Sequence, residues 1–157
     1  MGTNFQRTME ITGGLLKPMI DAFRDEMPAP FEAFGHLYAA AAADNVERYE
    51  DIAAAMADES RKVALFEFGL VPQPFFAFGC APLCLETYPL FFTRTSMETV
   101  YEFIEAAESA GISSETCSTD RFIIGAAVKG ELPDNSFFVT SSAPCDGTRI
   151  AYPILQK

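Results

Sequence analysis

The sequence predicts an α/β fold in which a Rossmann-like parallel sheet is flanked by helices and preceded by an N-terminal helical region. Three short apolar runs, at residues 63–68, 80–85 and 137–141, have the length and composition of buried strands. Segments with helical periodicity separate them, and strands that alternate with helices usually form a parallel sheet. With 157 residues, 49% of them hydrophobic, the chain can bury one sizeable core. We expect a helical region over residues 1–60 and a first cluster-binding α/β domain over residues 61–157, incomplete at its C-terminus.

The first third of the chain has helical periodicity. Apolar side chains recur every four residues at Met19, Phe23 and Met27, and a second stretch places an apolar face between Val46 and Met56. The prolines at residues 28 and 30 separate the two stretches. These patterns predict helices that cover a core.

Two further helices are predicted between the second and third strands. Thr95 and Glu98 form a capping-box pattern at the beginning of the first, and Gly111 ends it. Its predicted apolar stripe consists of Met97, Tyr101, Ile104 and Ala107. The second begins near residues 114–117 and ends at Gly130, and a last helix follows the third strand.

Composition excludes several classes of partner. The 22 acidic residues against 11 basic ones give a net charge of −11, which repels phosphate backbones and anionic lipid surfaces. The N-terminus lacks the features of a signal peptide, and no stretch of 18 apolar residues is present. We therefore expect a cytoplasmic protein that binds neither nucleic acid nor membranes.

Cys145 is one of two cysteines whose predicted positions favour chemistry. It follows a predicted parallel strand and precedes a helix, which is where open α/β sheets bind their ligands. The amide groups at a helix N-terminus stabilise a thiolate, which makes it a better metal ligand and nucleophile. The alternative is a small apolar residue in the turn formed by Pro144 and Asp146-Gly147.

Cys117 is the other candidate, because it too lies at a predicted helix start. It is 28 residues from Cys145, which matches no local metal-binding loop, so only the fold could bring the two sulfurs together. Taken alone, Cys117 fits a structural role better than a functional one. Cys80 and Cys84, in an apolar strand-like run, and His36, within a helical stretch, are interpreted as packing residues.

Three segments in the second half of the chain, Gly111–Arg121, Ile124–Pro133 and Phe138–Gly147, resemble the cluster-binding region of the 2-hydroxyacyl-CoA dehydratase and benzoyl-CoA reductase family. The preceding residues, Val63–Leu85, resemble the strand, turn and strand of the same family. The resemblance covers about residues 60 to 157 and corresponds to the N-terminal portion of a subunit such as the D-component of 2-hydroxyglutaryl-CoA dehydratase.

The resemblance implies an iron–sulfur cluster, most commonly [4Fe-4S], with Cys117 and Cys145 as two of three cysteine ligands. The third would lie downstream in a second α/β domain. It also implies a homologous second subunit, an ATP-dependent activator protein that donates electrons, and an acyl-CoA-type substrate. The activity would be that of a lyase or oxidoreductase of anaerobic metabolism. Pro74 stands near where many members carry an acidic residue.

Two other functions are compatible with the sequence. The chain could be a structural or interaction subunit that keeps the fold and holds no cluster. It could also be a family member that reduces a substrate other than a CoA ester. The residues that contact substrate are not predicted.

Overall fold

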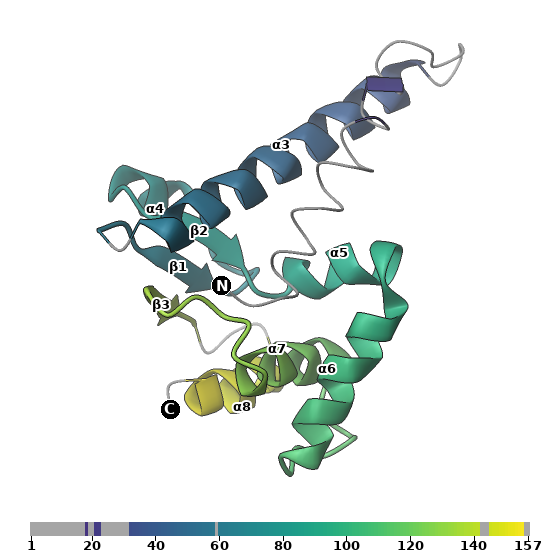
Figure 1. Ribbon diagram of the computed structural model, residues 1–157, viewed down its shortest axis with the longest axis vertical. Coiled ribbons are helices and arrows are strands. Elements are labelled where there is room, and N and C mark those ends of the chain that lie inside the picture. Colours follow the sequence, from purple (N-terminus) through teal and green to yellow (C-terminus); the bar gives the residue numbers. More distant parts are fainter. Residues whose placement is uncertain (1–17, 19–20, 23–31, 59, 142–144, 156–157) are drawn as a thin grey trace.

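The computed structural model describes residues 18, 21–22, 32–58, 60–141 and 145–155. Within this part the chain forms helices and a small sheet (Figure 1). In chain order the elements are α3 (Glu32–Ala57), β1 (Val63–Phe66), α4 (Gln73–Ala77), β2 (Ala81–Cys84), α5 (Thr87–Thr95), α6 (Met97–Ser109), α7 (Ser118–Val128), β3 (Ser136–Val139) and α8 (Asp146–Leu155).

The three strands form a parallel sheet in the order β2-β1-β3, as expected of an α/β fold. Leu65 in the central strand pairs with Leu83 on one side and Phe138 on the other. All four residues of β1 are buried, because helices cover both faces of the sheet. The prediction of a parallel sheet flanked by helices is therefore confirmed, although each strand is shorter than the apolar run that predicted it.

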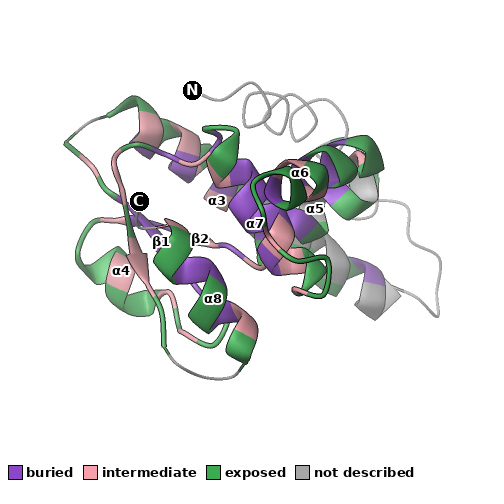
Figure 2. Ribbon diagram, turned by 90° about the horizontal axis from the view of Figure 1, so that it is seen from below, coloured by how far each residue is buried: buried purple, intermediate pink, exposed green. Residues whose placement is uncertain are grey.

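Helices lie on both sides of the sheet. In Figure 1, α3 crosses one side, and α6, α7 and α8 lie on the other. Buried residues concentrate in β1 and β2 and on the helix faces turned toward the core (Figure 2). Among the described residues no helix combines the length and the apolar character needed to cross a membrane.

The core is centred on the ring of Phe122 in α7. Its centroid lies 5.8 Å from those of Tyr88 and Phe92 in α5, and 5.0 Å from that of Phe103 in α6. All four side chains are at most 1% exposed. Edge-on and tilted aromatic pairs at these separations add to the stabilisation from burial alone.

Helices α6 and α7 approach each other closely at Gly125. A Cβ atom at this position would lie 1.8 Å from the carbonyl oxygen of Phe103. Only glycine fits at this contact, which brings the ring of Phe122 within reach of α6.

Glycines end two of these helices, as predicted. Gly111 follows α6 with φ +97°, and Gly130 follows α7 with φ +71°. Glycine adopts this left-handed backbone conformation at little cost. The amide of Ile112 then donates to the carbonyl of Ala107 over 3.1 Å, which closes the end of α6.

Several details of the helix predictions are wrong. Thr95 belongs to α5, and the residue that precedes α6 is Ser96, whose side chain makes no capping hydrogen bond. The helices α4 and α5 were not predicted. Met97 and Tyr101 are exposed, whereas the buried face of α6 consists of Thr99, Val100, Phe103 and Ala107. The predicted apolar positions Met19, Phe23 and Met27, and the prolines at 28 and 30, lie outside the described residues.

Candidate functional site

The carboxyl ends of the three strands lie at one edge of the sheet. The chain passes from β1 to β2 on one side and then crosses to β3 on the other side of β1. The strand order therefore changes direction at β1, and open α/β sheets bind their ligands at such a point. The residues that follow β1 and β3 are the first candidates for a site.

Cys117 is the N-cap residue of α7, so its sequence-predicted position at a helix start is confirmed. Its thiol is exposed and unbonded to another cysteine, and its carbonyl accepts a hydrogen bond from the amide of Arg121 over 3.0 Å. The Arg121 side chain reaches back to the carbonyl of Thr116 over 2.9 Å and forms an ion pair with Glu108. These contacts fix the backbone on both sides of Cys117.

Cys145 immediately precedes α8, as predicted, and is also an exposed free thiol. The hydroxyl of Thr148, itself buried, donates to the carbonyl of Cys145 over 2.9 Å. This bond fixes the first turn of the helix. Residues 142–144, between β3 and Cys145, lie outside the described part.

The first turns of α7 and α8 contact each other through Asp120 and Gly147. A Cβ atom on Gly147 would lie 2.0 Å from Oδ2 of Asp120, so the carboxyl group lies directly against the glycine. Asp120 is three residues after Cys117, and Gly147 is two residues after Cys145. The fold therefore brings together the two helix starts that carry the candidate cysteines.

Asp120 is unusual for an acidic residue because it is only 3% exposed. Burial raises the pKa of its carboxyl group, since the charged form loses its hydration. Its carboxyl group makes no hydrogen bond or ion pair with the other described residues. An acidic group so placed favours its neutral form.

Glu67, immediately after β1, is buried completely and links the ends of β1 and β3. Its carboxylate accepts a hydrogen bond from the hydroxyl of Thr140 over 2.9 Å and another from the amide of Ser141 over 3.0 Å. The hydroxyl of Ser141 also donates to it. A buried carboxylate is tolerated only when such donors replace water.

Glu86, just after β2, makes a second set of contacts at the same edge of the sheet. It accepts hydrogen bonds from the amide of Phe68 over 2.9 Å, from the hydroxyl of Tyr152 in α8 over 3.3 Å and, more weakly, from the thiol of Cys84 over 3.6 Å. Burial raises the pKa of Glu86 and of the Tyr152 hydroxyl, and it raises the pKa of the Cys84 thiol to about 11.

The remaining predicted packing residues differ in environment. Cys84 is half-buried and stays a thiol at neutral pH because of its raised pKa, which fits the packing role predicted for it. Cys80 is also half-buried. His36 is exposed on α3, so the interpretation as a packing histidine is wrong.

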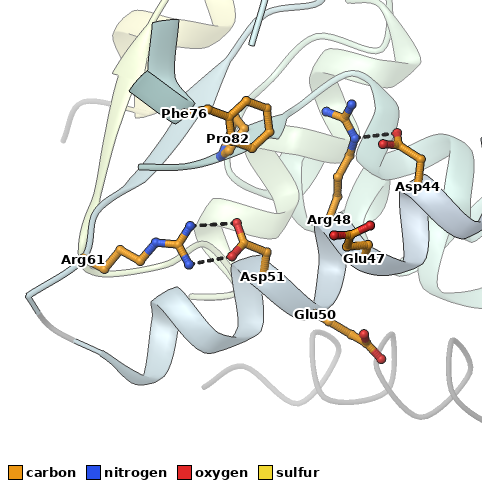
Figure 3. Close-up of a pocket in the computed structure, with 8 residues that line it drawn as sticks. All are labelled: Asp44, Glu47, Arg48, Glu50, Asp51, Arg61, Phe76 and Pro82. Atoms are coloured by element: carbon orange, nitrogen blue, oxygen red, sulfur yellow. Dashed lines mark hydrogen bonds and ion pairs between the residues drawn. The ribbon is translucent and has the colours of Figure 1, made fainter. Parts of the chain in front are cut away.

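A cavity lies away from the two candidate cysteines, between α3, α4 and β2 (Figure 3). It has a volume of about 590 Å³, and a smaller one of about 210 Å³ adjoins it. Both of its arginines are paired, Arg61 with Asp51 through two hydrogen bonds of 2.5 and 2.8 Å and Arg48 with Asp44 over 2.6 Å. Neither cavity is lined by Cys117 or Cys145.

The described residues were also compared with the ligand groups that metal ions need. No group of three or more His, Cys, Asp or Glu side chains in that part of the chain is placed to hold a metal ion. Thiolates are the ligands that iron–sulfur clusters require. The exposed thiols of Cys117 and Cys145, at adjacent helix starts, have the chemistry of two such ligands.

Comparison of the chain with protein families, with curated proteins and with solved structures found no match. Sequence reasoning did not identify Glu67 and Glu86 as functional candidates. The only local signal for Glu67 is an acidic residue inside the apolar run at residues 63–68. The sequence gives no sign of the contact between Asp120 and Gly147.

Proposed function

We propose that the chain is part of an iron–sulfur enzyme of the 2-hydroxyacyl-CoA dehydratase and benzoyl-CoA reductase type, with Cys117 and Cys145 as two ligands of its cluster. The observation that carries this proposal is the contact of Asp120 with Gly147, which places the two cysteine-bearing helix starts side by side. The sequence resemblance supplies the identity of the group, and the three-stranded parallel sheet flanked by helices is compatible with it.

The role of the residues follows from their positions. Cys117 and Cys145 would hold the cluster at the carboxyl edge of the sheet, where the first amides of α7 and α8 offer partial positive charge to anionic sulfur. A [4Fe-4S] cluster, when bound, would supply one-electron reduction of a thioester at low potential. The chain itself would orient the thiolates and hold the edge of the sheet rigid.

The remaining parts of the system come from the resemblance. They are a third cysteine ligand from a second α/β domain, a homologous second subunit, an ATP-dependent activator that donates the electron, and an acyl-CoA substrate. A cytoplasmic location suits an oxygen-sensitive cluster and four cysteines that form no disulfide.

Anaerobic reconstitution with ferrous iron and sulfide tests the proposal. Iron and acid-labile sulfide that survive desalting are measured for the wild-type chain and for the variants Cys117→Ala and Cys145→Ala. Because only two of the three cluster ligands implied by the resemblance are cysteines of this chain, we expect the wild type to retain iron and sulfide weakly. Both variants should lose most of that iron and sulfide. Cys80→Ala is the matched control, and equal retention by the wild type and the two site variants would contradict the proposal.

A second candidate is a cluster-free interaction domain with the same fold. It is favoured by the exposed apolar side chains between β1 and β2, namely Phe68, Val71, Phe76 and Phe78, which are 47–83% exposed. Light scattering of the metal-free chain tests it. Concentration-dependent association that is lost on Phe78→Ser, together with no iron binding, would favour this candidate over the first.

A further inference from the structure

Glu67 joins the central strand to the segment that carries Cys145. It follows β1 and is 0% exposed, and the donors described for its carboxylate come from residues 140 and 141, more than 70 positions away in sequence. The amide and the hydroxyl of Ser141 donate to Oε1, and the hydroxyl of Thr140 donates to Oε2. Hydrogen bonds to a charged acceptor are stronger than those between neutral groups.

These bonds end four residues before Cys145. On the far side of Cys145, the hydroxyl of Tyr152 in α8 donates to Oε1 of Glu86 over 3.3 Å. Ser141 and Tyr152, which lie on either side of Cys145 in the sequence, are therefore each bonded to a carboxyl group that follows a strand, and the two strands are neighbours. Gly147, between them in the sequence, lies against Asp120.

We propose that Glu67 is a positioning residue for Cys145: by holding the end of β3, it fixes where the Cys145 thiol lies relative to the Cys117 thiol. Cys117 is held by other contacts, because Arg121 bonds to Thr116 and Glu108 and α7 packs against α6. The expected effect of losing Glu67 is therefore confined to one of the two thiols. The claim that this geometry serves metal binding rests on the proposed function, whereas the claim about position does not.

The position of each thiol can be measured in the metal-free chain. A nitroxide is attached to Cys145 in a variant whose other three cysteines are alanine, and to Cys117 in the corresponding second variant. In Glu67→Ala we expect the spectrum of the Cys145 label to narrow, because the label gains mobility, while that of the Cys117 label stays unchanged. Deuterium uptake over residues 138–149 should become about tenfold faster, as expected when hydrogen bonds to a charged group are lost.

Three further variants separate positioning from general loosening. Glu67→Gln keeps the shape and one strong acceptor, so it should restore most of the wild-type spectrum. Ser141→Ala removes one donor and keeps the carboxylate of Glu67, which keeps the test valid where Glu67→Ala does not fold. It should also narrow the Cys145 spectrum. Glu131→Ala is the control, because Glu131 is a buried acid, 6% exposed, that lies between α7 and β3.

Equal narrowing of the Cys117 and Cys145 label spectra, or no narrowing of the Cys145 spectrum, would overturn the proposal. The link to metal is tested separately by the rate at which a chelator removes iron from the reconstituted chain. About tenfold faster release from Glu67→Ala than from the wild type supports it, and an unchanged rate rejects it. A wild-type chain that takes up no iron defeats the proposed function, and the spectra then still decide whether Glu67 positions Cys145.

Discussion

Replacement of Gly147 by alanine is the sharpest test of how the two cysteine-bearing helix starts meet. In an ordinary helix this change stabilises the fold by about 0.5–1 kcal/mol, because glycine loses more conformational freedom. Here the new Cβ would lie 2.0 Å from Oδ2 and 3.2 Å from Cγ of Asp120. Overpacking of this kind costs about 1–3 kcal/mol. The net expectation is a loss of about 1–2 kcal/mol in the free energy of unfolding.

The obstruction consists of one side chain, so it can be removed. In the Asp120→Ala background, Gly147→Ala should no longer destabilise the chain and should stabilise it by about 0.5 kcal/mol or more. The effect of one substitution then changes sign with the identity of another residue. Such a reversal is stronger support for direct contact than any single loss of stability.

Urea unfolding of the four chains, wild type, both single variants and the double variant, measures the four free energies. The slopes should agree, so that changes in midpoint report stability alone. In thermal unfolding, each kcal/mol corresponds to about 2–4 °C for a chain of this size. Additive effects within about 0.5 kcal/mol would refute the contact, and with it the observation that supports the pairing of Cys117 with Cys145.

Two further outcomes are expected from the same structure. Burial raises the pKa of Asp120 above its ordinary 3.8. Between the unfolded and the folded pKa, the folded chain therefore binds more protons than the unfolded chain, and its free energy of unfolding falls as the pH rises through this range. The stability of Asp120→Asn relative to the wild type should therefore increase from acid to neutral pH, as measured by urea unfolding. Free energies of unfolding that change with pH in parallel for the two chains would contradict this. Gly125→Ala should lower stability by about 3 kcal/mol, at the upper end for overpacking, because its Cβ would lie 1.8 Å from a backbone carbonyl. Thermal unfolding measures it, and rescue by Phe103→Leu would show that the side chain, rather than the carbonyl, is the obstacle.

The sheet could be predicted because local sequence determines it. The residues from Val63 to Phe66 are apolar throughout, which is typical of a central parallel strand covered on both faces. Gly111 and Gly130 end helices through a backbone conformation that only glycine adopts readily, so both ends were visible in the sequence. The position of Cys117 at a helix start followed from its polar neighbours and the apolar stripe after it.

The faces of the helices were less predictable. Tyr101 in α6 is 59% exposed and Thr99 is buried, because the neighbouring α7 approaches along a line set by Gly125. Nothing within α6 encodes that approach. The helix α5 was missed because Pro89 lies inside it, at a position in the first turn where proline is tolerated.

The acidic residues of the site were missed for a different reason. Glu67 meets its donors 73 and 74 positions later, and Glu86 meets Tyr152 66 positions later. Contacts between residues so far apart depend on the order of the strands, which a single sequence does not specify. A buried acid inside an apolar run is the one local sign that such donors exist, since its charge must be compensated.

The three acids around the beginning of α8 also bear on the proposed chemistry. Three hydrogen bonds replace water around the buried carboxylate of Glu67, whereas burial raises the pKa of both Glu86 and Asp120. A fixed negative charge close to a redox centre repels an arriving electron and so lowers the reduction potential. Under the proposed function, the carboxylate of Glu67 would both hold Cys145 in place and lie close to the centre, which suits a centre that must donate its electron at low potential.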